Sequence, residues 1–257
     1  MKPFLAFIRK EIAEQLRAGR LVILGVIFVL LGVMNPAVAK LTPWLMKMMA
    51  DSLAEAGMTV AAAEPTAADS WAQFFKNMPM GLIAFVLVEF GIFTREYESG
   101  TLVLSLTKGL SRRSVVIAKA AVLGAVWSLC FWLSTGVTWA YTEYFWDCQA
   151  LRSLPAALLC WWLFGLWIQA LTVFFSAVSR SGTGVLAGTG GAVFLCLLLG
   201  MIPRVGRYLP TALTEGYPVI LGAAETDVFT APALIAAAVS AACVGAALAV
   251  FNRRQIG

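Results

Sequence analysis

The sequence contains no histidine and few charged residues. Its 257 residues include 14 acidic and 19 basic side chains, so that 13% of the chain is charged, whereas a soluble domain carries about 25%. A soluble enzyme of this length needs a polar surface that these residues cannot supply. The absence of histidine also excludes histidine general bases, histidine metal ligands and histidine proton relays. The composition therefore argues against a soluble enzyme.

Cysteine pairs at metal-binding or redox spacing are also missing. None of the five cysteines forms a CxxC pair, and four lie in apolar runs, where cysteine behaves as a small hydrophobe. The chain also has no Gly-x-x-x-x-Gly-Lys-Ser/Thr loop, which is the usual cradle for nucleotide phosphates. We expect no disulfide, no metal site, no cofactor bound by this chain and no catalytic residue.

What the sequence does contain is six long runs with almost no charge. Hydrophobic residues make up 60% of the chain, and a helix of about 20 residues crosses a hydrocarbon core of about 30 Å. Helices are expected because backbone hydrogen bonds must close within the segment in lipid. The sequence predicts a single all-α membrane domain over residues 1–257, with spans at about 21–39, 78–94, 117–143, 155–178, 183–202 and 231–251.

The basic residues indicate how these spans are oriented. With the N-terminus in the cytoplasm, 13 of the 19 basic residues fall in inner segments, and nine of the 14 acids fall outside. This bias predicts that both termini are cytoplasmic. The basic residues stand at the ends of the apolar runs and form no single patch, so we expect membrane lipid as a partner and no nucleic acid.

Three segments outside the spans carry their own patterns. Residues 1–20 contain an amphipathic helix of the kind that lies in the membrane interface. Residues 40–77 form an outer loop, in which we expect a short surface helix near Trp44. Residues 203–230 contain three prolines, which favour short outer or re-entrant helices over a span. The charged positions of the N-terminal helix that we expect to contact a partner are Arg9, Lys10, Glu14 and Arg17.

Two features inside the predicted spans have two interpretations each. Glu89 is the only ionisable residue well inside a span, and an acid there is costly. It either lines a substrate pathway or pairs with a neighbouring helix. Gly184 and Gly188 form a GxxxG pattern, which lets helix backbones approach closely. They serve either packing within one chain, or a dimer interface or flexible gate.

The strongest local motif follows the second predicted span. Two acids, a glycine break and a short apolar stretch predict a helix–turn–helix elbow on the cytoplasmic side. Orientation by positive charge explains the arginines of this loop but not its acids. The motif consists of Arg95, Glu96, Tyr97, Glu98, Ser99, Gly100, Thr101 and Leu102.

This motif resembles the loop after the second helix in permeases of type-2 ATP-binding-cassette exporters. In that family a Ser-Arg pair and a lysine follow, matched here by Ser111, Arg112 and Lys119. The amphipathic start, the six spans, the large first outer loop and the proline-bearing segment before the last span are also similar. The resemblance implies a bacterial cell-membrane protein that pairs with a second copy or with a paralogous permease.

The resemblance also implies how the protein is powered. The loop at 95–102 is a coupling loop that inserts into a groove of a separate ATPase subunit, and the N-terminal helix contacts the same subunit. ATP and Mg are then bound by that partner. The pathway is built mainly from the first, second and fifth spans of the two permease halves.

The expected function is therefore export by a transport subunit that is not itself an enzyme. Apolar spans and an aromatic outer mouth favour a hydrophobic or amphipathic cargo, such as a peptide or toxin-like peptide. Lipid or drug efflux by the same architecture is an alternative. An ATP-independent secondary transporter is another, although such proteins place more ionisable or polar groups at mid-membrane than Glu89 alone.

Overall fold

The structure is a computed structural model that describes residues 2–48, 64–92, 111–148, 151, 153–179 and 181–253. These residues fold into helices, and no β-strand occurs among them. The elements are α1 (Lys2–Arg17), α2 (Arg20–Met48), α4 (Ala67–Glu89), α7 (Arg112–Phe145), α8 (Leu154–Val178), α9 (Gly182–Gly200), α10 (Pro203–Gly206), η1 (Pro210–Thr214), α11 (Gly216–Ile220), η2 (Thr226–Phe229) and α12 (Thr230–Arg253).

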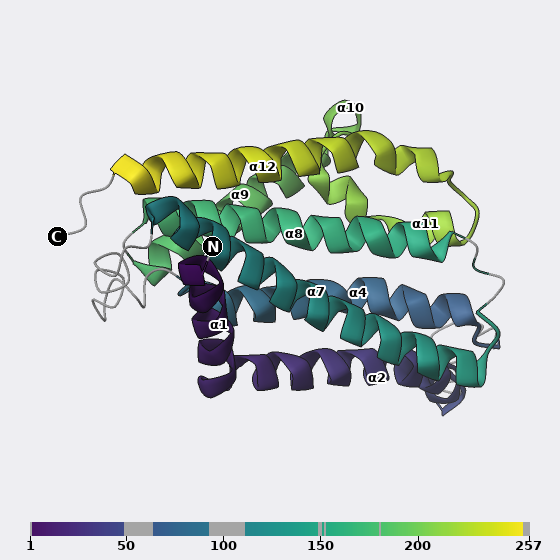
Figure 1. The fold of residues 1–257 in the computed structure, drawn as a ribbon. Helices are drawn as coiled ribbons and strands as arrows, with labels where there is room; N and C mark the ends of the chain where they lie inside the picture. The colour runs from purple at the N-terminus through teal and green to yellow at the C-terminus, as the bar shows by residue number, and fades with distance from the viewer. Residues whose placement is uncertain are drawn as a thin grey trace.

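Six of these helices are long and apolar enough to cross a membrane, namely α2, α4, α7, α8, α9 and α12. They lie lengthwise beside one another, and α1 crosses their direction at one end of the bundle (Figure 1). The last turns of α12 lie at that same end (Figure 1). For the residues that the structure describes, the predictions of an all-α fold and of six helices able to span a membrane are confirmed.

Two helices extend further into the expected first outer loop than the sequence indicated. α2 continues to Met48 with Pro36 and Pro43 inside it, so Trp44 belongs to its last turns and starts no separate surface helix. α4 begins at Ala67 and ends at Glu89, whereas we expected 78–94. The other four long helices agree closely with the expected spans, and the largest difference is the start of α7 at Arg112 instead of 117.

The longer course of α2 and the earlier start of α4 have one physical cause. We took Lys40 and Lys76 as the edges of spans, but both lie on helices whose backbone continues past them. The Lys40 ammonium lies 3.6 Å from the ring centroid of Phe145, and Lys76 is exposed. A lysine stem carries its charge away from the helix axis, so a lysine need not mark a helix end.

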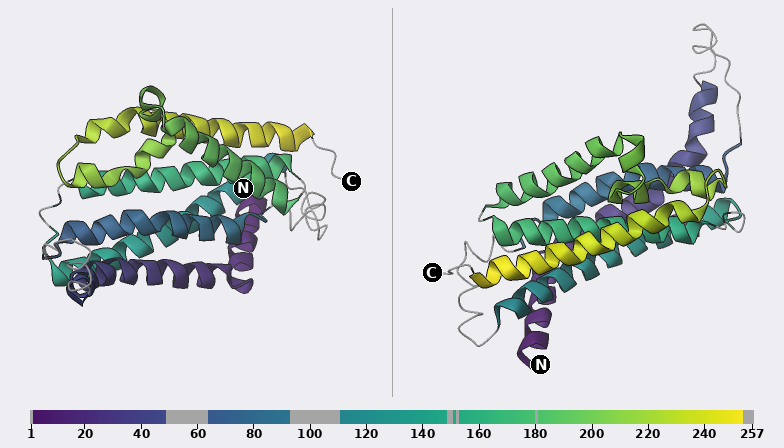
Figure 2. Two further views of the ribbon diagram at one scale, coloured as in Figure 1. Left: turned by 180° about the vertical axis from the view of Figure 1, so that it is seen from behind. Right: turned by 90° about the horizontal axis from the view of Figure 1, so that it is seen from above.

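The long helices pack as two groups. α2 contacts α4 and α7, while α8 contacts α9 and α12 (Figure 2). Trp127 of α7 joins the groups. Its ring centroid lies 6.0 Å from that of Phe28 and 5.4 Å from that of Phe85, and its indole fills the space that a Cβ on Gly165 of α8 would occupy. Aromatic rings therefore fill this part of the core, and Gly165 leaves the space that the Trp127 indole occupies.

The proline-bearing segment between α9 and α12 forms the short helices α10, η1, α11 and η2 in place of a span. η1 and α11 pack against α8, and the Trp161 indole nitrogen of α8 donates a hydrogen bond to the Thr214 carbonyl at 3.2 Å. Leu213 and Val219 are buried in this contact. Short helices were expected here, and their depth in a membrane stays a prediction.

Candidate functional site

Four buried polar side chains connect α1 to the bundle, and we refer to them as the α1 cluster. They come from three helices that are distant in sequence: Glu11 and Gln15 from α1, Glu89 from α4, and Lys119 from α7. Glu11 and Gln15 lie four residues apart, so both point from the same face of α1. That face is turned towards α4 and α7.

The first contact of the α1 cluster is an ion pair. Lys119 Nζ lies 2.8 Å from Glu11 Oε2, with side chains 2% and 8% exposed. Lys10 Nζ adds a second ammonium 2.9 Å from Glu11 Oε1, and it also lies 3.0 Å from Glu14 Oε2. Removing two charges from water is costly unless they are well paired and hydrogen-bonded. This geometry meets that requirement and fixes α1 against α7.

The second contact joins α1 to the end of α4. Gln15 Nε2 donates a hydrogen bond of 2.7 Å to Glu89 Oε2, and Glu89 is buried. This contact agrees with the interpretation in which Glu89 pairs with a neighbouring helix. The partner helix is α1, which is not one of the spans. A pathway role for Glu89 stays a hypothesis.

The helix α1 has three sides. Its buried side carries the polar residues Glu11 and Gln15 together with Phe7, which the sequence did not single out. A second, exposed side is apolar and consists of Leu5, Ile12 and Leu16. The third is charged and includes Arg9, Lys10 and Arg17, all exposed. An exposed apolar side beside a basic side is the composition of a helix lying in a membrane interface.

A sharp joint turns α1 into α2. Only Ala18 and Gly19 separate the two helices, and the chain turns sharply between them (Figure 1). Gly19 has a φ of 69°, in the left-handed region that residues with a Cβ seldom adopt. A Cβ here would meet no atom within 4 Å. The backbone conformation, and not a lack of space, therefore explains the glycine.

The expected coupling motif, Arg95 to Leu102, lies outside the described residues. Its flanks lie at the end of the bundle where α1 crosses, because α4 ends and α7 begins there (Figure 1). Ser111 caps α7 by accepting a hydrogen bond of 3.1 Å from the Ser114 backbone nitrogen. Arg112 Nη1 donates at 3.3 Å to the Asn252 carbonyl in the last turn of α12. The first turn of α7 thus carries a cap of its own and a hydrogen bond to the last turn of α12.

The glycine pair on α9 faces its own chain. A Cβ on Gly188 would overlap the ring of Phe175 on α8, and one on Gly184 would overlap Ser179. Further along α9, Phe194 and Leu197 line a groove towards α4 and α8, whereas Leu195 and Leu198 are exposed outside that groove and form an exposed apolar side. The glycines take part in packing within the chain, while a dimer interface on this helix stays a hypothesis.

A polar network between α2, α4 and α7 was missed in the sequence. Asn35 Nδ2 donates to Thr138 Oγ1 at 3.0 Å, and Asn77 Nδ2 donates to Asn35 Oδ1 at 2.9 Å. Thr138 Oγ1 in turn donates to the Gly32 carbonyl at 3.1 Å. An asparagine inside an apolar run was the available signal, but we considered only ionisable residues. These polar groups form hydrogen bonds with one another across three helices, which fits a role in holding the helices together.

An apolar groove of about 630 Å³ opens between α4, α8 and α9. Its walls are mainly aliphatic and aromatic, and hydroxyl groups of three threonines are the polar exceptions. The volume is within the range of small-molecule sites, which are lined mostly by apolar side chains. The threonines are Thr189, Thr211 and Thr214.

Comparison with known proteins identifies most of the chain. The model of the family described as "ABC-2 family transporter protein" matches residues 5–226. This range includes all four residues of the α1 cluster and the motif at 95–102. No curated protein and no solved structure gives a significant match to the chain.

Proposed function

Because the chain belongs to the ABC-2 transporter family, whose membrane proteins are transport components that work with an ATP-binding-cassette ATPase, we propose that it is the permease subunit of an ATP-driven exporter. A separate ATPase supplies the energy, and the cargo is a hydrophobic or amphipathic molecule, such as a peptide or toxin-like peptide. The observation that carries the proposal is the α1 cluster, which ties α1 to the end of α4 and to the first turns of α7, the two helices between which the motif at 95–102 falls in the sequence.

The α1 cluster offers a mechanical route from the ATPase to the spans. The partner binds the motif at 95–102 and the exposed basic side of α1, which includes Arg9 and Arg17. When the ATPase closes on ATP, it moves α1 and the motif together. Lys119 passes that motion to α7 through Glu11, and Glu89 passes it to α4 through Gln15.

The groove between α4, α8 and α9 supports the cargo class. An apolar site of about 630 Å³ with scattered hydroxyls suits a molecule with alkyl or aromatic parts and a few hydrogen-bonding groups. Peptides, lipids and drugs all fit that description. The exposed apolar side of α9 supports pairing with a second copy or a paralogous permease, because a pathway between two subunits needs such a face. The α1 end of the bundle is then cytoplasmic, the same side as ATP.

The experiment tests association and coupling separately. The chain is co-expressed with the ATPase encoded beside it, either subunit is used to purify the other, and cargo export is measured in inverted vesicles. We expect Glu96→Ala/Glu98→Ala to weaken co-purification, or to stop export while ATP hydrolysis continues. Glu143→Ala/Asp147→Ala serves as the matched control, since both acids are exposed at the far end of α7 and should leave both readouts unchanged.

Two results would refute the proposal. One is undiminished export in the Glu96/Glu98 double variant. The other is transport by the chain alone when an ion gradient is imposed without ATP, which is the behaviour of a secondary transporter. Vanadate traps such ATPases. It should stop export if an ATPase powers the chain, and it should have no effect if the chain is a secondary transporter.

A further inference from the structure

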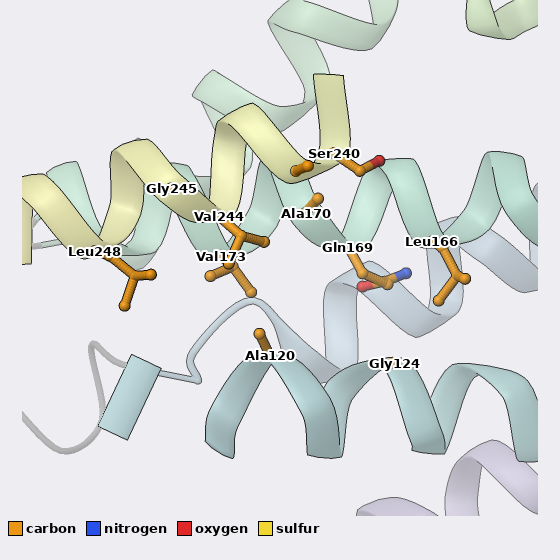
Figure 3. Close-up of a pocket in the computed structure, with 11 residues that line it drawn as sticks. Ala120, Gly124, Leu166, Gln169, Ala170, Val173, Ser240, Val244, Gly245 and Leu248 are labelled. Carbon is orange, nitrogen blue, oxygen red and sulfur yellow. The ribbon is translucent and has the colours of Figure 1, made fainter. Parts of the chain in front are cut away.

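A second groove, of about 510 Å³, lies between α7, α8 and α12 and is distinct from the one proposed for cargo. It is lined largely by small residues, and Figure 3 shows α12 above it, α8 behind it and α7 below. Ala120, one residue after Lys119, places it in the half of the bundle nearer α1. The small lining residues are Ala120, Gly124, Ala170, Ser240, Ala241 and Gly245.

Gln169 of α8 points into this groove. Figure 3 shows that its amide lies between α8 and Gly124 of α7. The residue is 3% exposed, and neither Nε2 nor Oε1 has a hydrogen-bond partner among the described residues. It lies nine residues before Val178, the end of α8, or about 14 Å along the helix. At that depth in lipid an amide without a partner is costly, because no bulk water is present to replace it.

The small residues leave space that packing within the chain does not use. A Cβ on Gly245 would meet no atom within 4 Å, and one on Gly124 would meet only Leu166 at 3.5 Å. Gly165 and Gly188 differ, because an aromatic ring of the same chain already fills the space over each. The open space gives a ligand room, and the unsatisfied, buried amide of Gln169 is the observation that points to one.

We propose that this groove binds an uncharged amphiphile from the α1-side leaflet, whose hydroxyl or amide exchanges hydrogen bonds with Gln169 while its alkyl chain lies along the small residues. The amide of Gln169 offers a donor and an acceptor, so the complementary group must accept and donate as well. None of the described residues that line the groove is charged, so an ionised group there would have no counter-charge among them. The polar lining consists of Gln169 and Ser240, whose hydroxyl already donates to the Ala236 carbonyl at 2.7 Å.

The test uses a photoreactive monoacylglycerol that carries a diazirine in its acyl chain. The full-length protein in detergent is irradiated with the probe, and labelled peptides are mapped by mass spectrometry. We expect label on the facing segments of α7, α8 and α12, and at least a fivefold loss of label in Gln169→Leu, which keeps the size of the side chain and removes its hydrogen bonds. A diazirine alkane of the same length, which lacks a hydroxyl, should label these segments much less.

Two glycine variants keep the test valid even if Gln169→Leu does not fold. Gly245→Leu places a branched side chain in the groove from a position where a Cβ meets no atom of the chain within 4 Å, and it should abolish the label. Gly136→Leu is the matched control, because a Cβ on Gly136 of α7 also meets no atom within 4 Å but the residue is outside the groove. It should label like the original protein. Melting temperatures of all variants establish that the labelled proteins are folded.

Several outcomes would overturn the inference. One is equal labelling of Gly245→Leu and Gly136→Leu, and another is equal labelling by the alkane. A third is conversion of a dimer to a monomer by Gly245→Leu, because the groove would then be an interface between copies. If labelling is as expected, ATPase stimulation by the monoacylglycerol in the assembled complex marks the ligand as cargo, and its absence marks a membrane lipid. None of the labelling results depends on the proposed ATP-driven export.

Discussion

Lys119 and Glu11 form an ion pair 108 residues apart in sequence, with 2.8 Å between Nζ and Oε2, inside the contact of α7 with α1. This pair makes α1 an integral part of the bundle. A helix held only by its apolar side would slide along the interface, since apolar contacts are non-directional. A buried, charge-assisted hydrogen bond fixes one register.

Breaking the pair on one side should destabilise the protein strongly. Glu11→Leu removes the carboxylate that lies against the buried Lys119 ammonium, and the loss of one partner of a buried pair costs about 3–5 kcal/mol. The double variant Glu11→Leu/Lys119→Met removes both charges and should lose less stability than the sum of the two single variants. Reversible denaturation in mixed micelles measures all three.

Lys10→Met provides the control for that cycle. The Lys10 side chain is 41% exposed, and exposed ion pairs contribute about 0–1 kcal/mol. Its effect should therefore stay within that range. Strictly additive effects of Glu11→Leu and Lys119→Met would mean that the two charges do not interact.

Gly32 and Gly25 of α2 should respond differently to the same change. A Cβ on Gly32 would lie 2.8 Å from Val137 Cβ and 2.9 Å from the Ser134 carbonyl, whereas a Cβ on Gly25 would meet nothing within 4 Å. Gly32→Ala must push α2 away from α7, at a cost of about 1–3 kcal/mol. Gly25→Ala should be neutral or slightly stabilising, because alanine favours a helix.

Melting temperatures of the two variants measure the difference. A melting temperature of Gly32→Ala equal to that of Gly25→Ala would contradict the close contact between α2 and α7.

The two ends of α7 should be reachable from opposite sides of the membrane. Tyr144 is 81% exposed near the last turn of α7, and Arg113 is exposed in its first turn. In a cysteine-free background, Tyr144→Cys should react with a membrane-impermeant maleimide in intact cells. Arg113→Cys should react only after permeabilisation. The reverse pattern would place the α1 end outside and remove the site proposed for the ATPase.

Cys148 should react with maleimide in a pH-dependent way that differs from a free thiol. Burial, and then the neighbouring Glu143 carboxylate, raises the pKa of the Cys148 thiol to about 11. The thiol is therefore neutral around pH 7, and the reactive thiolate fraction rises about tenfold per pH unit until the pH approaches the pKa. In a background where the other four cysteines are alanine, the alkylation rate should still be rising at pH 10.

Tyr144→Cys, with Cys148 also replaced by alanine, is the comparison for that measurement. As an exposed thiol, the cysteine at position 144 should level off near the free-cysteine pKa of about 8.5. A plateau for Cys148 below pH 9.5 would show that its thiol is neither buried nor affected by Glu143. Glu143→Gln removes the carboxylate that raises the Cys148 pKa most after burial, and should move the plateau to lower pH.

The sequence predicted the number and nature of the long helices because a span is a local property. Twenty apolar residues in a row are sufficient, whatever the rest of the chain does. The same method misplaced the start of α4 at 78 instead of Ala67, since Lys76 was read as a boundary. Lysine on a helix near the interface extends its ammonium outwards, and the helix runs on beneath it.

The α1 cluster was not predictable in the same way. Glu11 and Gln15 look like part of the solvated side of an amphipathic helix, and only their distant partners make them buried residues. The sequence identified Lys119 only as a residue shared with the family and gave it no partner. It left open whether Glu89 faces a pathway or another helix. A pattern along one helix identifies its polar side but not which polar side another helix will cover. The Asn35 network had a local signal, an asparagine inside an apolar run, but its partners Thr138 and Asn77 could not be predicted from that signal.

The short connection at Gly19 is one of three attachments that hold α1 to the bundle. The helix is held to α2 by this connection, to α4 through Glu89 and to α7 through Lys119. A force applied to α1 therefore acts on α2, α4 and α7 together. The remaining spans, α8, α9 and α12, form the other group of helices. Both grooves lie between these two groups, so a displacement of one group relative to the other would change the width of both grooves.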